Sequence, residues 1–195
     1  MDSEALKVEA LCWLRFTKKM ELIATEAGNW NADVLGVGDQ FSIEIEVKVS
    51  KSDLKREFQN KTAKHFLYNN AERGPGQHVP NYFYFYVPAT LEKEALALID
   101  EHKSKAGLAV YGDLAGEVMD GKRTRIAKRP GKLHDRKPSD RLKRAVLLRM
   151  GSELCGRYVA NRELRNRIFK ALEELALHVT EKVRGLASPL DWLDL

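Results

Sequence analysis

The pattern of apolar and polar positions in the first fifty residues predicts one helix followed by three strands. Apolar side chains recur every three or four positions between residues 3 and 19, which is the spacing of one helix face. Three short runs at residues 22–27, 32–37 and 41–49 then have the composition of strands and are separated by turns that contain glycine. We therefore expect a helix that leads into a three-stranded antiparallel meander.

The next segment alternates between helical and strand patterns. Ser50 and Asp53 have the spacing of a helix start, and a helical pattern continues over residues 54–68. After a loop at 69–80 that contains glycine and proline, the aromatic run 82–87 resembles a strand that is buried on both faces. A helix at 91–102 and a strand at 108–111 follow. The expected fold class is α/β, with a central mixed sheet of meander and parallel strands flanked by helices.

The pattern is weaker beyond residue 113. Residues 117–119 and 123–127 have the composition of a hairpin, and helical periodicity returns at 140–150 and 162–184. We expect two parts: a core domain at residues 1–135, and a C-terminal helical extension at 136–195 that packs on or beside the core. The apolar stripe of the last helix could serve in packing or in dimerisation.

Composition narrows the class of protein. The 195 residues carry a net charge of +5, contain no apolar stretch long enough to span a bilayer, and begin with an acidic segment unlike a signal peptide, so we expect a cytoplasmic protein that does not enter membranes. Cys12 and Cys155 have no disulfide or zinc spacing and are expected to be buried thiols. Residues 122–144 hold eleven Lys or Arg against two Asp, which suits a polyanionic partner, although a solvated face or a linker has the same composition.

Candidate chemistry lies on the third predicted strand. Because side chains alternate along a strand, Glu44, Glu46 and Lys48 share one face with Ser42, opposite the apolar residues. Asp33 lies on the neighbouring strand. Carboxylate oxygens bind hard divalent metals, and a lysine near them can act on a phosphate and an attacking water. The alternative is a strand face that is open to solvent and whose charges pair with neighbours.

Asp33, followed after thirteen positions by Glu46-Val47-Lys48, on a hairpin that precedes a helix and another strand, resembles the PD-(D/E)XK, or restriction-endonuclease-like, nuclease superfamily. The resemblance covers about residues 22–113. Within the superfamily, the sequence is similar to bacterial DNA-repair and phage-encoded members. Ala32 stands where the family name has proline. The resemblance implies a restriction-endonuclease-like core and a Mg²⁺- or Mn²⁺-dependent nuclease.

Carried over residue by residue, the resemblance implies that Asp33 and Glu46 bind the metal, and that Lys48 orients the attacking water or stabilises the charge of the transition state. Glu26, on the preceding strand, is a further candidate metal ligand or a surface residue at a strand end. The roles of Glu9 and Glu44 stay open.

The helix after Lys48 carries a stripe that begins apolar and becomes polar: Leu54, Phe58, Lys61, His65 and Tyr68. Burial of Lys61 and His65 among apolar groups would be costly, so this end of the helix is expected to face a polar cleft, unless both side chains reach back to solvent. The side chains expected to contact nucleic acid are Lys51, Lys55, Lys61, Lys64 and His65.

The leading hypothesis is therefore a metal-dependent nuclease that hydrolyses phosphodiester bonds in DNA, as an endonuclease or an exonuclease. RNA is not excluded as a substrate, and a homodimer is one arrangement. A second hypothesis is a DNA-binding or scaffolding protein of the same fold without catalysis. A third is a protein-interaction surface with the basic segment as a linker. The sequence does not choose among substrate structures.

Overall fold

The computed structural model describes residues 2–28, 30–71, 79–112 and 123–186. The chain divides into two units, Met1–Gly151 and Ser152–Leu195. The boundary therefore lies later than the expected one after residue 135, because the first turns of the last helix pack with the sheet and belong to the first unit.

A six-stranded mixed sheet forms the centre of the first unit, in the order β1-β2-β3-β4-β5-β6. The strands are β1 (Leu22–Ala27), β2 (Ala32–Val37), β3 (Ser42–Val47), β4 (Tyr82–Pro88), β5 (Gly107–Tyr111) and β6 (Thr124–Lys128). Neighbours in β1–β2–β3 and β5–β6 are antiparallel, whereas β3–β4–β5 are parallel. The expected α/β class, with a meander joined to parallel strands, is confirmed. The other arm of the expected hairpin, at residues 117–119, lies outside the described residues.

One face of the sheet is covered by the N-terminal helix. Helix α1 (Ser3–Cys12) is capped by Asp2, whose side chain accepts a hydrogen bond from Ala5 N at 2.8 Å, and continues as the short π-helical turn η1 (Trp13–Thr17). Leu6 and Trp13 are buried with the apolar side chains of β3 and with the tyrosines of β4, and the Trp13 and Tyr84 rings meet edge to face. These apolar and aromatic contacts fix α1 on this face.

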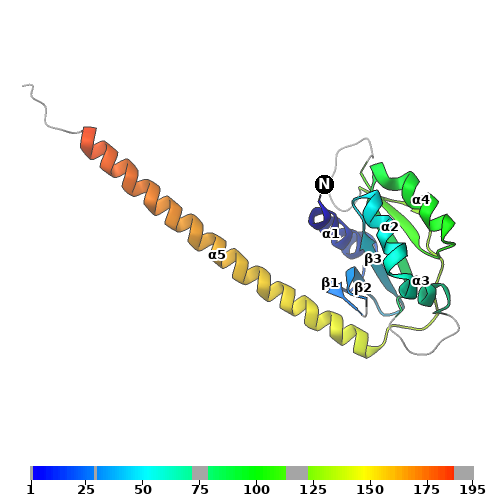
Figure 1. Cartoon of the computed structure of the whole chain (residues 1–195). Helices are drawn as coiled ribbons and strands as arrows, with labels where there is room; N and C mark the ends of the chain where they lie inside the picture. The colour runs from blue at the N-terminus through cyan, green and yellow to red at the C-terminus, as the bar shows by residue number, and fades with distance from the viewer. Residues whose placement is uncertain (1, 29, 72–78, 113–122, 187–195) are drawn as a thin grey trace, which may run out of the picture. The chain divides into compact units, whose positions relative to one another are not determined.

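The opposite face is covered by α2 (Lys51–Asn60), α3 (Thr62–Asn69) and α4 (Glu92–Glu101), which lie together on that side of the sheet, with the single turn η3 (Ala89–Leu91) before α4 (Figure 1). Phe83 and Phe85 of β4 pack against them, so both faces of the aromatic strand are core, as predicted. The expected single helix 54–68 is wrong in one respect. At Lys61 the backbone leaves the helical region, with φ −109° and ψ 37°, and separates α2 from α3.

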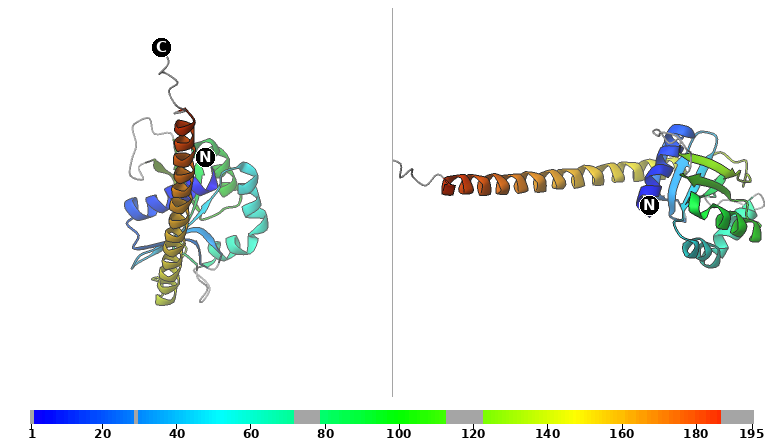
Figure 2. Two further views of the ribbon diagram at one scale, coloured as in Figure 1. Left: turned by 90° about the vertical axis from the view of Figure 1, so that its left-hand side faces the viewer. Right: turned by 90° about the horizontal axis from the view of Figure 1, so that it is seen from above.

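The last helix, α5 (Asp140–Leu186), has no break where two helices were expected, and Figure 2 shows its ribbon as one helix. Gly151 and Gly156 do not interrupt it. Leu142 and Val146, in its first turns, pack against the β1–β2 end of the sheet. Cys155 is exposed and Cys12 is half-buried, so the expectation that both thiols are buried is wrong. None of the helices in the described part of the chain is both long and apolar enough to cross a bilayer.

Candidate functional site

The polar face of β3 is buried beneath α2 and α3. Glu44, Glu46 and Lys48 are 4%, 2% and 7% exposed. In the parallel register Glu44 lies beside Phe83 and Glu46 beside Phe85, so the acidic side chains share the sheet face that the helices cover. The prediction that these side chains share one face is confirmed, and the alternative of a strand face open to solvent is wrong.

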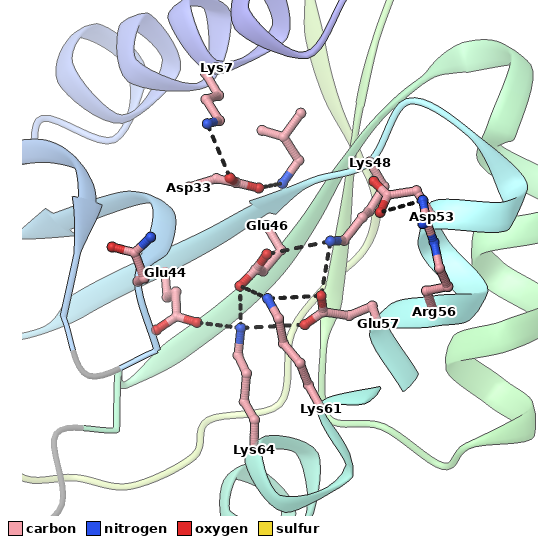
Figure 3. Close-up of polar contacts among 12 residues, drawn as sticks. Lys7, Asp33, Glu44, Glu46, Lys48, Asp53, Arg56, Glu57, Lys61 and Lys64 are labelled. Carbon is pink, nitrogen blue, oxygen red and sulfur yellow. Dashed lines mark hydrogen bonds and ion pairs between the residues drawn. The ribbon is translucent and has the colours of Figure 1, made fainter. Parts of the chain in front are cut away.

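Glu46 is surrounded by three lysines from separate segments of the chain (Figure 3). Lys61, between α2 and α3, is 3.1 Å from Oε1, and Lys48, which directly follows β3, is 3.5 Å from Oε2. Lys64 of α3 makes a direct contact with Oε1. The expectation that Lys61 faces a polar site is confirmed by this contact, and its side chain stays about one-third exposed. Charges buried in this way are tolerated because each one has an opposite partner.

Glu57 of α2 is a second centre of the same cluster. Its carboxylate oxygens lie 2.9 Å from Lys48, 3.0 Å from Lys61 and 3.5 Å from Lys64. Burial would raise its pKa, but nearby His65 and these lysines outweigh burial and hold the pKa of Glu57 well below its usual range. Glu57 was not among the site residues expected from the sequence, although its position three residues after buried Leu54 and next to Phe58 places it on the buried side of the helix.

Lys64 is fully buried and joins Glu46 to Glu44. Its ammonium lies 2.9 Å from Glu44, whose other oxygen accepts a hydrogen bond from the Tyr68 hydroxyl at 2.7 Å. Burial would lower the pKa of Lys64, but the charges of Glu44, Glu46 and Glu57 outweigh it and raise that pKa. Burial raises the pKa of Glu44. We call Glu44, Glu46, Glu57, Lys48, Lys61 and Lys64 the charge cluster.

Asp33 lies on β2 beside the charge cluster. The antiparallel register pairs Val34 with Ile45, so the next position toward the strand end sets Asp33 against Glu46. Its Oδ2 accepts a hydrogen bond from the Val47 backbone at 2.8 Å, and its Oδ1 is 3.4 Å from Lys7. Burial, and then the charge of Glu46, raise the pKa of Asp33. The register thus brings Asp33 and Glu46 together, as expected.

Lys7 of α1 links Asp33 to Glu26. Its ammonium is 2.6 Å from Glu26, which also accepts a hydrogen bond from the Asn31 side chain at 2.6 Å. Burial would lower the pKa of Lys7, but Glu26 and Asp33 raise it on balance. Lys7 was not among the site residues expected from the sequence. Glu9 is half-buried, and its charge contributes to the raised pKa values of Cys12 and Tyr86, on the α1 side of the sheet.

The donor set bears on the expected metal. Asp33 and Glu46 offer carboxylate oxygens, which suit Mg²⁺ or Mn²⁺. Burial, followed by the charge of Glu46, raises the pKa of Asp33, and a divalent cation would relieve the repulsion between the two carboxylates. Glu26 reaches Asp33 through the Lys7 ammonium, which holds the two acidic groups together. Within residues 2–28, 30–71, 79–112 and 123–186, no three His, Cys, Asp or Glu side chains form a group that could hold a metal ion. Binding of a divalent metal by the Asp33 and Glu46 pair stays a prediction.

The expected nucleic-acid contacts fall into two groups. Lys51 and Lys55 are exposed on α2, and Lys51 lies 4.0 Å from Glu94. His65 is buried, and its ring stacks on Phe58 at 4.6 Å between centroids. Lys64 is buried as well, so in this arrangement neither His65 nor Lys64 presents a charge to a ligand outside. The phosphate contacts of all five side chains stay predictions.

The basic segment 122–144 is distributed over several elements. Arg123 and Arg125 flank or lie in β6, and Arg125 pairs with Glu92 of α4. Lys143, in the first turn of α5, lies 2.6 Å from Asp39. Part of the positive charge of the segment therefore stabilises the fold through neighbouring carboxylates, and its binding to a polyanion stays a prediction.

Comparison with known proteins assigns neither a family nor a function. No protein-family model matches the sequence, and no curated protein matches it. A similar solved structure is that of a protein of unknown function from Silicibacter pomeroyi, with 15% sequence identity and a TM-score of 0.46 over 81% of this chain and 88% of that chain. A similarity of this size carries no argument about activity.

Proposed function

We propose that this protein is a metal-dependent nuclease that hydrolyses phosphodiester bonds in DNA. One observation carries the proposal: Asp33 and Glu46 lie side by side across β2 and β3, and Lys48, two residues after Glu46, lies 3.5 Å from that carboxylate. Two carboxylates beside an ammonium supply the groups that a phosphoryl-transfer site needs for a divalent cation and for a phosphate.

Asp33 and Glu46 would hold Mg²⁺ or Mn²⁺, with Glu26 as a further candidate ligand. The bound metal would supply charge stabilisation at the phosphate and a more acidic water. In its absence the ammonium groups of Lys7, Lys61 and Lys64 balance these carboxylates. Such pairing offsets part of the cost of burying these carboxylates together.

Lys48 would act as a charged donor. Burial would lower its pKa, but the charges of Glu57 and Glu46 outweigh burial and raise the pKa of Lys48. A protonated lysine has hydrogen atoms to donate and no lone pair to accept a proton. Of the two roles expected from the sequence, orientation of water and stabilisation of developing negative charge by donation are both open to it, whereas proton abstraction is not.

The nucleic acid would contact α2, where Lys51 and Lys55 are exposed. Lys61, which is partly exposed and contacts Glu46, would lie between this surface and the Glu46 carboxylate. The basic segment 122–144 would extend this track. The substrate is DNA in this proposal, and RNA is the alternative ligand for the same phosphate contacts. A cytoplasmic location and a homodimer belong to the proposal as well, since one site in each chain cuts one strand of a duplex.

The test is metal-dependent cleavage of plasmid and of single-stranded DNA by wild type, Asp33→Asn, Glu46→Gln and Lys48→Met. We expect each substitution to lower the rate at least about 100-fold, because each removes a group that acts on the reacting phosphate. Glu101→Gln, an exposed acidic residue at the end of α4, is the matched control and should cleave like wild type. Circular dichroism verifies that each variant is folded. Equal rates in all five proteins, or activity that persists in EDTA, would refute the proposal.

A second candidate is a nucleic-acid-binding protein without catalysis. It is favoured by the complete pairing of the charge cluster, in which Glu44, Glu46 and Glu57 each contact at least one lysine. Titration calorimetry with Mn²⁺ separates the two candidates. A nuclease should release or absorb heat as Mn²⁺ binds, and Asp33→Asn should abolish this binding heat. A protein that only binds nucleic acid should bind DNA but give no binding heat with Mn²⁺.

A further inference from the structure

Helix α5 carries a narrow apolar stripe after Gly151. Its side chains are each 51–59% exposed: Leu154, Leu164, Ile168, Leu172, Leu175 and Val179. With an advance of about 100° per residue, these positions fall within an arc of about 80°. We call them the α5 stripe. Over the 25 residue steps from Leu154 to Val179 the stripe runs for about 37 Å, at about 1.5 Å per residue.

A stripe of this kind needs a covering surface. Helices in water gain most of their stability by packing an apolar face, and an isolated helix is marginal even with good helix formers. Contiguous apolar patches that are rimmed by polar residues mark sites of association. The remainder of the helix surface from Ser152 to Glu181 carries most of its Arg and Glu, together with four exposed apolar side chains outside the arc: Tyr158, Val159, Phe169 and Leu177. The arc itself also holds Arg157 and Asn161, so the stripe is continuous from Leu164 to Val179 and interrupted before Leu164. With six apolar side chains in one arc, the stripe is the face that is best suited to contact.

The charges along α5 indicate what the stripe contacts. Residues 152–167 contain four arginines against two glutamates, a net charge of +2, whereas residues 168–181 contain one lysine against three glutamates, a net charge of −2. A second α5 laid antiparallel sets the basic half of each helix against the acidic half of the other. A parallel second α5 sets like charges together along the whole length. Charge complementarity of this kind selects partner and orientation.

We propose that α5 pairs with α5 of a second copy of this chain in an antiparallel arrangement, with the two stripes in contact. A two-fold axis perpendicular to the helices makes the contact self-complementary, as closed dimers require. Full overlap of the stripes pairs Leu154 with Val179 of the partner and places the axis near Asn166. The proposal stands on α5 alone and does not depend on nuclease activity.

The mass of the protein in solution tests the pairing. The 195-residue chain, of 22.2 kDa, should sediment as a dimer at tens of micromolar. Leu172→Glu, within the stripe, should give a monomer with weaker helical circular dichroism. Leu177→Glu is the matched control, because Leu177 is 65% exposed on the same helix but five residues, or about 140°, away from Leu172. It should stay a dimer.

The orientation is tested by a distance between spin labels. Cys155 is exposed, so in a Cys12→Ser background it takes one label on each chain. With the axis near Asn166, antiparallel helices separate the two labels by about 23 residue steps, or about 35 Å, whereas parallel helices leave them about 10 Å apart. Pulsed electron resonance distinguishes these values.

Three outcomes would overturn the inference. The first is a monomeric wild type at these concentrations, which would mean that the stripe folds onto its own chain or awaits another protein. The second is a dimer that Leu172→Glu and Ile168→Glu both leave intact. The third is a short label distance. Each of these outcomes leaves the cleavage assays untouched, so the proposed nuclease activity and the proposed α5 pairing succeed or fail separately.

Discussion

Strand β3 has two faces that are equally buried and chemically opposite. On one face Ile43, Ile45 and Val47 are at most 3% exposed and pack under α1. On the other face Glu44 and Glu46 are 4% and 2% exposed beneath α2 and α3. Burial of the apolar face stabilises the fold through removal of hydrocarbon from water, whereas burial of the charged face costs desolvation that only close pairing offsets.

This difference separates what the fold needs from what a function needs. A buried ion-pair network is often no more stable than apolar residues of similar volume, so stability alone does not account for six charged side chains in one place. The apolar face would serve any α/β protein. The charge cluster, with Asp33 at its side, is the part that the proposed chemistry uses.

The largest loss of stability is expected when the most buried charge of the cluster is removed. Lys64→Met should lower the free energy of unfolding by about 4 kcal/mol, because Glu44, Glu46 and Glu57 lose a shared buried partner. Urea unfolding at pH 7 measures the change. Lys55→Met, on the exposed side of α2, is the control and should change stability by less than about 0.5 kcal/mol. A loss below about 1 kcal/mol for Lys64→Met would mean that the cluster is open to water.

Glu57→Gln should cost somewhat less, about 3 kcal/mol at pH 7, and its effect should depend on pH. The pKa of Glu57 in the fold lies below its ordinary value of 4.5, so its contribution is fully present above pH 4.5 and is lost as pH falls through the lower folded value. The gap between wild type and variant should therefore narrow below pH 4.5. Unfolding measured from pH 7 to pH 3 tests this, with Glu101→Gln as the control. A gap that widens in acid would contradict the assignment.

On the apolar face of β3, a conservative substitution should lower the stability only slightly. Ile45→Val removes one methylene group from a fully buried site and should cost about 1 kcal/mol at every pH. DNA cleavage should be unchanged, since Ile45 points away from Glu46. Stability and cleavage are measured on the same preparation. A loss of activity without a loss of stability would show that the two faces are not independent.

The smallest effect is expected at the surface. Lys55→Ala should leave stability within about 0.5 kcal/mol of wild type, because Lys55 is exposed. If Lys55 contacts a phosphate, the slope of log K for DNA against log salt should fall by about one. Filter binding at several salt concentrations gives the slope. An unchanged slope would remove Lys55 from the nucleic-acid track.

The sequence predicted the sheet well because strand patterns are local. The period of two along residues 42–48 alone assigns Glu44 and Glu46 to one face, and the glycine-containing turns set the meander. The proximity of Asp33 to Glu46 followed from the hairpin register. These features depend on near neighbours in the chain, so a single sequence contains them.

Other parts of the site depend on contacts between distant segments. Lys7 meets Glu26 and Asp33 only after α1 packs across the sheet, and no local pattern shows that. The break at Lys61 changes the phase of the helix stripe, so that Lys64 as well as His65 points inward. In α5 the expected interruption is absent because glycine lowers helix stability by only about 1 kcal/mol per residue.

The formal charges of the cluster cancel: three carboxylates face three ammonium groups. If a divalent cation binds beside Glu46, the site gains a net charge of +2. The negative charge of a bound phosphodiester backbone then offsets part of this excess. Metal and nucleic acid should then strengthen the binding of each other by the same factor, as thermodynamic linkage requires. A protein built in this way would hold its metal more firmly once its polyanion has arrived.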